Sequence, residues 1–172
     1  MRRAFILVIV ATGASACATT GAVPQPFPTP RGAAVAVPGP PEPSPGPPAD
    51  AYAISGTALA LRGTPYRNGG ADPSGFDCSG FVWYVFSQHG VPVPRTVSEQ
   101  ARAGNHVETA DLRAGDLLFF ATTTGTQAAT HVAISIGGDE FVHAPSSVGQ
   151  VRVERLGSSY WGPRLVEARR LQ

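Results

Sequence analysis

The chain has 172 residues, of which 42% are hydrophobic and 15% charged, and its formal net charge is +1 at pH 7. This near-neutral balance, without a run of basic residues, argues against nucleic acid as a partner, because nucleic-acid-binding surfaces need clustered Lys and Arg. Residues 51–172 have the length of one ordinary domain and enough apolar side chains to bury a core. We expect this domain to be monomeric.

The N-terminus is typical of an export signal. Arg2 and Arg3 form a basic start, the apolar run 4-AFILVIV-10 follows, and small residues lead to Cys17. Such a run is too short to stay in a bilayer as a lasting anchor. We therefore predict a signal peptide over residues 1–16 and a mature protein in the cell envelope, facing the periplasm or the wall. The paired arginines leave a twin-arginine export route open.

Cys17 follows the signal directly. The segment 14-ASAC-17 resembles the lipobox of bacterial lipoproteins, in which a signal peptidase leaves a lipidated cysteine at the new N-terminus. It departs from that pattern at Ala14, where leucine is usual. The alternative is an ordinary secretory signal cut after 14-ASA-16. We favour lipidation of Cys17, and hence a membrane anchor, because a cysteine at this position is otherwise unexplained.

Residues 17–50 are crowded with proline, as in 38-PGPPEPSPGPP-48. Proline lacks a backbone donor and fixes φ, so neither a helix nor a sheet can propagate through this segment. The composition predicts an extended linker. Behind a lipid anchor, such a linker would let the domain of residues 51–172 reach away from a membrane surface.

Two helices are predicted in the first half of the domain. Residues 52–62 are rich in alanine and leucine, and glycine and proline follow them. Residues 63–75 form a loop dense in Gly, Pro, Asn and Asp. Residues 78–89 carry apolar side chains at helical spacing, which predicts a second helix with one buried face. That face contains Phe81, Val82, Val85 and Phe86.

Cys78 begins this second helix, and Asp77 is placed to cap its N-terminus. The partial positive charge and unpaired N–H groups of a helix N-terminus favour a thiolate, so we expect a lowered pKa for Cys78. A disulfide would need Cys17, the only other cysteine, across the proline linker. If Cys17 is lipidated or removed, Cys78 has no partner, and an unpaired thiol in an exported protein indicates chemical use. The alternative is a small buried hydrophobe.

The second half of the domain carries β patterns. They cover residues 116–120, 131–136, 140–144, 151–155 and 165–169. Helices followed by a run of strands are typical of an α+β domain with an antiparallel sheet. Residues 121–130 form a loop to which the pattern assigns no role.

The four histidines differ in their surroundings. His89 at a helix end and His106 in a polar loop are expected at the surface. His131 and His143 lie on the two strands of a hairpin that turns at residues 137–139.

The register of this hairpin decides whether the two histidines meet. A three-residue loop would pair Ile136 with Glu140 and place Ala133 opposite His143. His131 would then be the diagonal neighbour of His143 on the same face. The small Ala133 and its neighbour Ser135 on that face would leave room for the cysteine helix.

This arrangement predicts a cysteine nucleophile with two supporting histidines. Cys78 would attack, His131 would act as its base, and His143 would fix the orientation and tautomer of His131. Zinc is the alternative for one cysteine and two histidines, but no pair has the usual ligand spacing and a fourth ligand is missing. We therefore expect neither a metal nor an organic cofactor.

Six segments in order resemble the NlpC/P60 family. They are 66-YRNGG-70, 76-FDCSGFVWYVF-86, 94-PRTVSEQ-100, 115-GDLLFF-120, 131-HVAISIG-137 and 141-FVHAP-145. The resemblance implies a papain-like α+β fold, with the cysteine helix packed on an antiparallel sheet. It implies hydrolysis of peptidoglycan stem peptides, usually between γ-D-glutamate and a diamino acid. It also implies Cys78 as nucleophile, His131 as base and His143 as third member of a Cys-His-His triad.

The same resemblance implies three substrate-binding residues. Tyr66 matches a tyrosine near the nucleophile, and its hydroxyl would help to stabilise an oxyanion. Asp77 and Ser79 match positions that shape the peptide-binding site, although Asp77 also has its role as helix cap. For Arg95 we favour anchoring of its loop over contact with a substrate carboxylate, and for Thr96, Ser98 and Gln100 a structural role.

Three other functions stay open at this point. A lipoprotein of the same fold could bind wall peptides without cutting them, although an intact Cys78, His131 and His143 favour catalysis. An amidase or acyltransferase on a related scaffold would act on a different bond. A structural tether between membrane and wall is favoured by the proline-rich segment alone.

Overall fold

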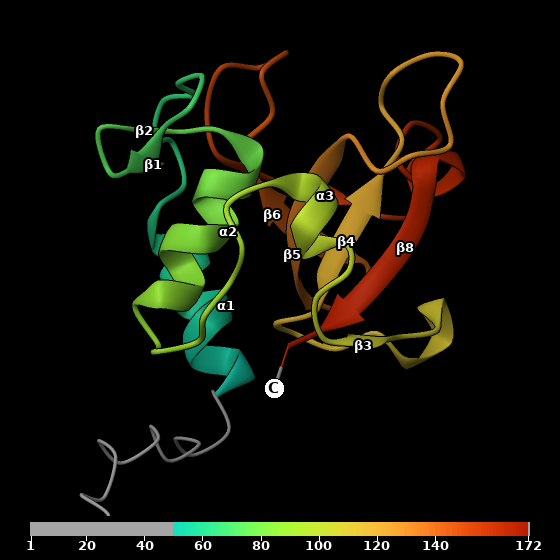
Figure 1. The fold of residues 1–172 in the computed structure, drawn as a ribbon, viewed down its shortest axis with the longest axis horizontal. Coiled ribbons are helices and arrows are strands. Elements are labelled where there is room, and N and C mark those ends of the chain that lie inside the picture. Colours follow the sequence, from blue (N-terminus) through green and yellow to red (C-terminus); the bar gives the residue numbers. More distant parts are fainter. Residues whose placement is uncertain (1–49, 172) are drawn as a thin grey trace, which may run out of the picture. The chain divides into compact units, whose positions relative to one another are not determined.

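The computed structural model describes residues 50–171, and Figure 1 shows their fold. The predicted signal peptide over residues 1–16, lipidated Cys17 and the linker up to residue 49 lie outside the described residues. Among residues 50–171, no helix is long and apolar enough to cross a membrane.

Two helices of ten residues confirm the predicted helical segments. Helix α1 (Ala51–Ala60) begins at Asp50, whose side chain accepts a hydrogen bond from the Tyr52 amide, and helix α2 is Cys78–Ser87. Both end about two residues before the predicted boundary, because the chain turns into shorter i→i−3 hydrogen bonds there. A third helix, α3 (Val97–Gln100), was not predicted, since four residues show no periodicity.

The strands form a six-stranded antiparallel sheet in the order β3-β8-β4-β5-β6-β7, which confirms the predicted α+β class. The five predicted strands are present as β4 (Leu117–Phe120), β5 (His131–Gly137), β6 (Glu140–His143), β7 (Arg152–Arg155) and β8 (Leu165–Arg170). Three two-residue strands were not predicted: β1 (Ala71–Asp72) and β2 (Gly75–Phe76), which pair inside the expected loop 63–75, and β3 (Asn105–His106). Short 3₁₀ turns at Thr109–Asp111 and Gly162–Arg164 complete the secondary structure.

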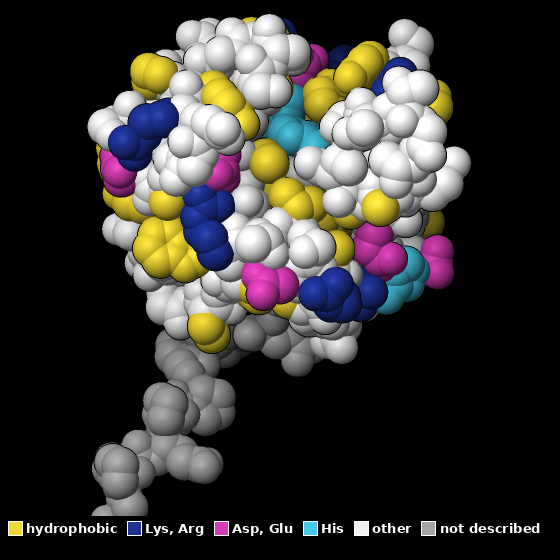
Figure 2. Space-filling view, turned by 45° about the horizontal axis from the view of Figure 1, so that its top comes forward, with side chains coloured by type: hydrophobic (Ala, Val, Ile, Leu, Met, Phe, Trp, Pro, Cys, Tyr) yellow, Lys and Arg dark blue, Asp and Glu magenta, His cyan; other side chains and the backbone are white. Residues whose placement is uncertain are grey.

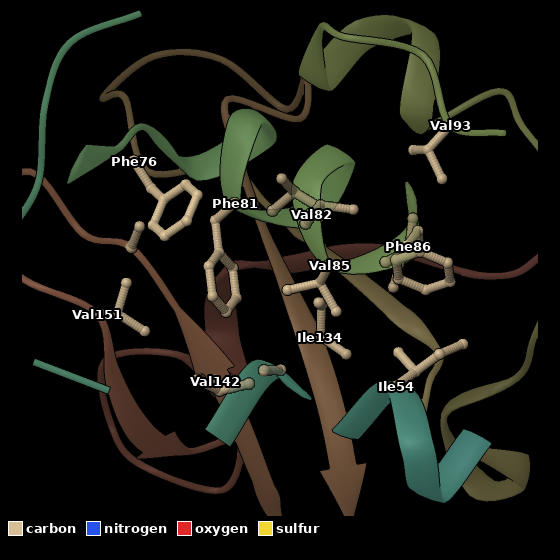
Figure 3. Close-up of a cluster of buried hydrophobic side chains, with 14 of the residues drawn as sticks. Ile54, Phe76, Phe81, Val82, Val85, Phe86, Val93, Ile134, Val142 and Val151 are labelled. Atoms are coloured by element: carbon tan, nitrogen blue, oxygen red, sulfur yellow. The ribbon is translucent and has the colours of Figure 1, made fainter. Parts of the chain in front are cut away.

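The main core lies between the sheet and the two long helices, which both lie on one side of it (Figure 1). Phe81, Val82 and Val85 of α2 are fully buried and point toward Ile134 of β5 and Val142 of β6 (Figure 3). The helical spacing of the α2 residues and the alternation of the strands thus place apolar side chains in one layer.

The opposite face of the sheet carries a second cluster. It contains Leu118, Phe120, Ala133, Phe141, Trp161, Ala168 and Val107. Because side chains alternate along β5, Val132 and Ile134 face α2, while His131 and Ala133 face this second cluster. The expectation that Ala133 makes room for the cysteine helix is therefore wrong.

The β5–β6 hairpin has the predicted register but a different turn. Ile134 pairs with Val142 and Ser135 with Phe141. Extended by one residue, this register places Ala133 opposite His143, as expected. Glu140, however, pairs with Gly137 instead of Ile136, and a register shift lies between Ser135 and Gly137. A two-residue turn would by itself have put the histidines on opposite faces. The bulge supplies the one-residue offset that returns them to the same face.

Candidate active site

Cys78 occupies the first position of α2, and its helix cap is as predicted. The Asp77 side chain accepts a hydrogen bond from the Gly80 amide at 2.6 Å. Gly80 has to be glycine, because a Cβ there would collide with the carbonyl oxygen of Gly70. The thiol of Cys78 is partly exposed and forms no disulfide. The sequence thus brings a reactive side chain to a helix end whose backbone is closely packed.

The expected low pKa of Cys78 is not found. Burial raises the pKa of the thiol above its ordinary value of 9.0, and the nearby Asp77 carboxylate raises it further. Backbone N–H groups of Ser79, Val132 and Cys78 itself act in the opposite direction, but they do not offset burial. The helix end alone would favour the thiolate, but its cap, Asp77, places a negative charge beside the sulfur. At neutral pH the resting group is therefore a thiol.

A hydrogen bond from the Val132 backbone N–H places Cys78 close to the histidine strand. Val132 follows His131 at the start of β5, and its backbone N–H donates to the Cys78 sulfur, which lowers the pKa of the thiol. The N-terminal end of α2 therefore meets the first residues of β5. Cys78 thus lies next to the residue that follows His131 in the chain.

His131 and His143 are in direct contact. Nε2 of His131 lies 2.8 Å from Nδ1 of His143, and the two rings are nearly perpendicular, with an interplanar angle of 82°. The side chains are buried, with 8% of His131 and 0% of His143 exposed. The predicted meeting of these residues is confirmed. Figure 2 shows, in its upper half, a hollow where histidine atoms reach the surface between hydrophobic groups.

Both histidines are held neutral. Burial lowers the pKa of His131 to about 4. Burial, followed by the charges of His131 and Arg152, lowers the pKa of His143 to about 2. A neutral imidazole has one donor and one acceptor nitrogen, so a single proton is shared across the 2.8 Å contact. If His131 donates it from Nε2, its Nδ1 is free to accept a proton from a thiol.

Trp161 is a residue of this site that the sequence interpretation missed. Its indole is stacked against His131 at 5.6 Å between ring centroids and 29° between planes, and meets His143 edge-on at 4.9 Å. It excludes water from both imidazoles and so contributes to the burial that lowers their pKa values. One sequence feature could have identified Trp161, namely its large aromatic side chain within the mainly polar loop 157-GSSYWGPR-164.

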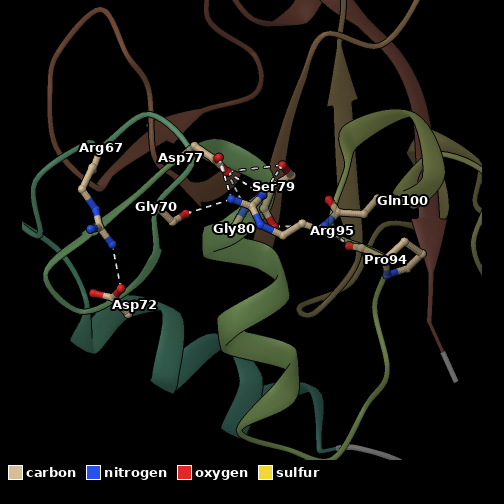
Figure 4. Close-up of polar contacts among 9 residues, drawn as sticks. All are labelled: Arg67, Gly70, Asp72, Asp77, Ser79, Gly80, Pro94, Arg95 and Gln100. Carbon is tan, nitrogen blue, oxygen red and sulfur yellow. Dashed lines mark hydrogen bonds and ion pairs between the residues drawn. The ribbon is translucent and has the colours of Figure 1, made fainter.

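Arg95 holds the start of α2 in place, as favoured from the sequence (Figure 4). Its guanidinium donates to both carboxylate oxygens of Asp77, at 3.0 and 2.7 Å. It also donates to the Ser79 hydroxyl at 3.0 Å and to the Gly70 carbonyl at 3.2 Å. Burial alone would raise the pKa of Asp77, but the hydrogen bonds from Arg95 and Gly80 hold it below its ordinary value.

The neighbouring residues named from the sequence support this network. Gln100 is fully buried and donates from Nε2 to the carbonyls of Ser79 and Pro94, and Thr96 caps α3. The Ser98 hydroxyl lies 3.4 Å from that of Thr96. Their predicted structural role agrees with these contacts.

Of the predicted substrate-binding residues, Tyr66 lies close to the nucleophile. Burial raises the pKa of its hydroxyl, and the charges of Cys78 and Asp77 raise it further. Asp77 and Ser79 use their polar atoms on Arg95 in this structure. The substrate-binding roles of all three stay predictions.

The remaining histidines lie apart from this site. His89 contacts the Thr57 hydroxyl at 2.8 Å and so links the turn after α2 to α1. His106 is exposed on β3, not in a loop, and its ring contacts Glu167 and Glu108. Within residues 50–171, no group of three or more His, Cys, Asp or Glu side chains could hold a metal ion. The loop 121–130 is closed by Thr122 and Thr130, whose hydroxyl oxygens lie 2.9 Å apart.

Comparisons with known proteins agree with this geometry. The NlpC/P60 family model matches residues 63–170. The gamma-D-glutamyl-L-lysine dipeptidyl-peptidase of Bacillus subtilis is 39% identical over 66% of this chain and 38% of its own length. The murein DD-endopeptidase MepS/murein LD-carboxypeptidase of Escherichia coli is 43% identical over 64% of this chain and 57% of its own length.

A solved structure shares the fold. The crystal structure of an NlpC/P60 family protein from Bacillus cereus superposes with a TM-score of 0.68 at 34% identity, over 73% of this chain and 41% of that protein. The described domain thus corresponds to only part of each of these larger proteins. The family match covers more than half of the chain and includes Cys78, His131 and His143. The chain belongs to the NlpC/P60 family.

Proposed function

We propose that this chain is a cysteine endopeptidase that hydrolyses peptidoglycan stem peptides through a thioacyl intermediate on Cys78. The observation that carries the proposal is the buried His131–His143 pair, in contact at 2.8 Å, beside the end of the helix that presents Cys78. The names of the relatives support the substrate class, since they are a γ-D-glutamyl-L-lysine peptidase and a murein endopeptidase.

In the proposed mechanism, His131 is the base and His143 is its positioning residue. His131 donates its Nε2 proton to Nδ1 of His143, so that Nδ1 of His131 accepts the thiol proton. The raised pKa of Cys78 and the lowered pKa of His131 mean that both groups are neutral before substrate binds. Proton transfer therefore accompanies the attack and does not precede it.

The first half-reaction forms the thioester. The Cys78 sulfur bonds to the peptide carbonyl carbon as its proton moves to His131, and the carbonyl oxygen becomes an oxyanion. The Tyr66 hydroxyl and the backbone N–H of Cys78 stabilise that oxygen. His131 then returns the proton to the leaving amine as the carbon–nitrogen bond breaks. Asp77 and Ser79 shape the binding site on the acyl side.

The second half-reaction releases the acyl group. His131 takes a proton from water, the hydroxide attacks the thioester, and the carbon–sulfur bond breaks as the proton passes to sulfur. The products are a carboxylic acid, a free amine and the regenerated thiol. No metal or organic cofactor takes part in this sequence.

The favoured bond lies between γ-D-glutamate and the diamino acid, as the name of the B. subtilis relative indicates for that protein. The name of the E. coli relative favours an alternative, a DD bond in the crosslinks. Digestion of purified peptidoglycan, with mass spectrometry of the new peptide ends, separates them. New N-termini on the diamino acid support the first bond, and opened crosslinks the second. New N-termini on the first alanine would instead indicate an amidase, and an absence of new ends a wall-binding protein.

We also propose that residues 1–16 are removed on export, that Cys17 carries a lipid, and that residues 17–50 tether the catalytic domain of residues 51–172 to a membrane. The lipobox-like segment before Cys17 supports this arrangement. Mass spectrometry of the mature N-terminus tests it. A diacylglyceryl group on Cys17 is expected, and an unmodified N-terminus at Cys17 would leave only secretion.

A further inference from the structure

A cavity of about 330 Å³ lies beside the loop 121–130. Its walls come from residues 121–124, which follow β4, and from residues 163–164 of the 3₁₀ turn before β8. The Ala121 backbone N–H donates to the Arg164 carbonyl at 2.9 Å, and the Thr122 N–H donates to the Thr130 hydroxyl at 2.9 Å. The two walls are therefore tied to each other and to the residue that precedes His131.

One cation lines this cavity without a counter-charge. Arg164 is half-buried, is the only charged residue of the lining, and has no ion pair within residues 50–171. The polar part of the remaining wall consists of threonines, whose hydroxyl groups can donate to an anion. They are Thr122, Thr123 and Thr124. This lining favours a negatively charged ligand.

The guanidinium of Arg164 is held in place before any ligand binds. It lies over the Tyr160 ring at 4.0 Å from the ring centroid, and its Nη1 donates to the Tyr160 carbonyl at 2.7 Å. This is the only hydrogen bond of the guanidinium within residues 50–171, so Nε and Nη2 are available. These two nitrogens form the edge of the fork that matches both oxygens of a carboxylate. A fork fixed in advance also loses less conformational entropy on binding.

A series of aromatic contacts connects Arg164 to the catalytic histidines. The Tyr160 and Trp161 ring centroids lie 4.8 Å apart, and those of Trp161 and His131 5.6 Å apart. Since an extended chain spans about 3.3–3.6 Å per residue, Arg164 lies within the length of about four peptide residues from His131. A group that Arg164 recognises can therefore belong to the peptide that is cut, yet be remote from the scissile bond.

We propose that Arg164 and the three threonines, the carboxylate pocket, bind the C-terminal carboxylate of a stem peptide. This inference rests on the proposed peptidase function and adds a preference for stem peptides whose end is free. In a crosslink, the donor stem has this carboxyl group in an amide bond and offers no charge to Arg164. The α-carboxylate of γ-D-glutamate is not the ligand, because it belongs to the residue that acylates Cys78 and stays beside the sulfur.

Two forms of one tetrapeptide, L-Ala-γ-D-Glu-L-Lys-D-Ala, test the pocket: one ends in a carboxylate and the other in an amide. We expect the native protein to have a kcat/KM for the acid roughly tenfold above that for the amide, as one charge-assisted pair gives. Arg164→Gln should reduce this ratio toward one by slowing only the acid, so the unchanged amide rate reports an intact fold. Arg164→Lys, which keeps the charge without the fork, should give an intermediate ratio.

Arg62→Gln is the matched control. Arg62 also has no ion pair within residues 50–171, but it lines a different cavity together with Gly63 and Val153. This variant should keep the native ratio. A third peptide, with the α-carboxylate of D-glutamate converted to an amide, separates the two carboxylates of the substrate. Its effect on the rate should be the same in native and Arg164→Gln protein, and an effect that disappears only in Arg164→Gln would overturn the assignment to the C-terminus.

A binding measurement tests the pocket without turnover. In Cys78→Ala protein, calorimetry should give a dissociation constant for the acid tetrapeptide roughly tenfold below that for the amide, and Cys78→Ala, Arg164→Gln protein should show no difference. Native protein that cleaves neither peptide would remove the peptidase proposal, while calorimetry would still decide the pocket. Absent binding of the acid, equal affinity for both forms, or a difference that persists without Arg164 would overturn the carboxylate pocket.

Discussion

His131 Nε2 lies 2.8 Å from His143 Nδ1, in a contact that a β-bulge makes available by offsetting the turn of the β5–β6 hairpin. Among residues 50–171, Nε2 of His143 has no hydrogen-bond partner. Nδ1 of His131 is the nitrogen that accepts the thiol proton in the proposed mechanism.

Replacement of His143 by alanine should reduce kcat by about 10²–10⁴-fold without abolishing turnover, because His131 loses the acceptor that fixes its tautomer. His143→Asn should recover part of the loss, since its amide oxygen can accept the same proton. Steady-state kinetics of both variants checks this. His89→Ala is the matched control, as His89 contacts only Thr57 through its ring, and should keep the native rate. An alanine variant at position 143 with native kcat would remove His143 from the mechanism.

The pH profile of kcat/KM should show no loss of activity near pH 6.5, the pH at which an ordinary histidine becomes protonated. Since the pKa of His131 is lowered to about 4, the base is unprotonated above that pH and the rate falls only as pH drops through it. Since the pKa of Cys78 is raised above 9.0, the resting group is a thiol at neutral pH. The ultraviolet thiolate absorbance of native protein minus Cys78→Ala protein should be absent at pH 7. A thiolate signal at that pH would show that Cys78 and His131 form a thiolate–imidazolium pair in the resting protein, and would contradict this prediction.

Removing the Trp161 indole, which is stacked on His131, should raise the pKa of His131. Trp161→Phe keeps part of the stacking, and Trp161→Ala exposes the imidazole, so the pKa should move from about 4 toward 6.5 in that order. NMR titration of the histidine ring protons measures the shift. Trp83→Phe, which changes the more exposed tryptophan on α2, should leave the value unmoved. An unchanged pKa of His131 in Trp161→Ala would show that groups other than Trp161 bury its imidazole.

Loss of Arg95 should destabilise the domain, because it leaves the half-buried Asp77 carboxylate with fewer donors. We expect Arg95→Ala to lower the free energy of unfolding by about 1–3 kcal/mol, measured by urea denaturation. The control is Arg67→Ala, whose ion pair with Asp72 is exposed on both sides and should contribute nothing measurable. Equal effects of the two substitutions would contradict a special role for Arg95.

The sequence predicted most of the fold because its long elements carry strong patterns. The α2 face of Phe81, Val82 and Val85 recurs at helical spacing, and Asp77 is a recognisable cap. The short elements α3, β1, β2 and β3 escaped prediction, since two to four residues hold no period and depend on tertiary contacts. The hairpin shows the same limit: its register followed from residue parity, but its bulge did not.

At the candidate site, the contact of His131 with His143 and the place of Cys78 at the start of α2 could be predicted, while the electrostatics of these residues could not. The pKa of Cys78 depends on how deeply the fold buries it and on the charge of the neighbouring Asp77, and spacing reveals neither effect. Trp161 reaches the histidines from the loop between β7 and β8, so only the folded chain brings it there.

The measurement that tests the central claim most directly is digestion of purified peptidoglycan by native and Cys78→Ala protein at equal concentrations. Mass spectrometry counts the new peptide ends, and thermal unfolding verifies that the variant is folded. The account predicts ends from the native protein and none above background from the folded variant. New ends at the native rate from Cys78→Ala would contradict it.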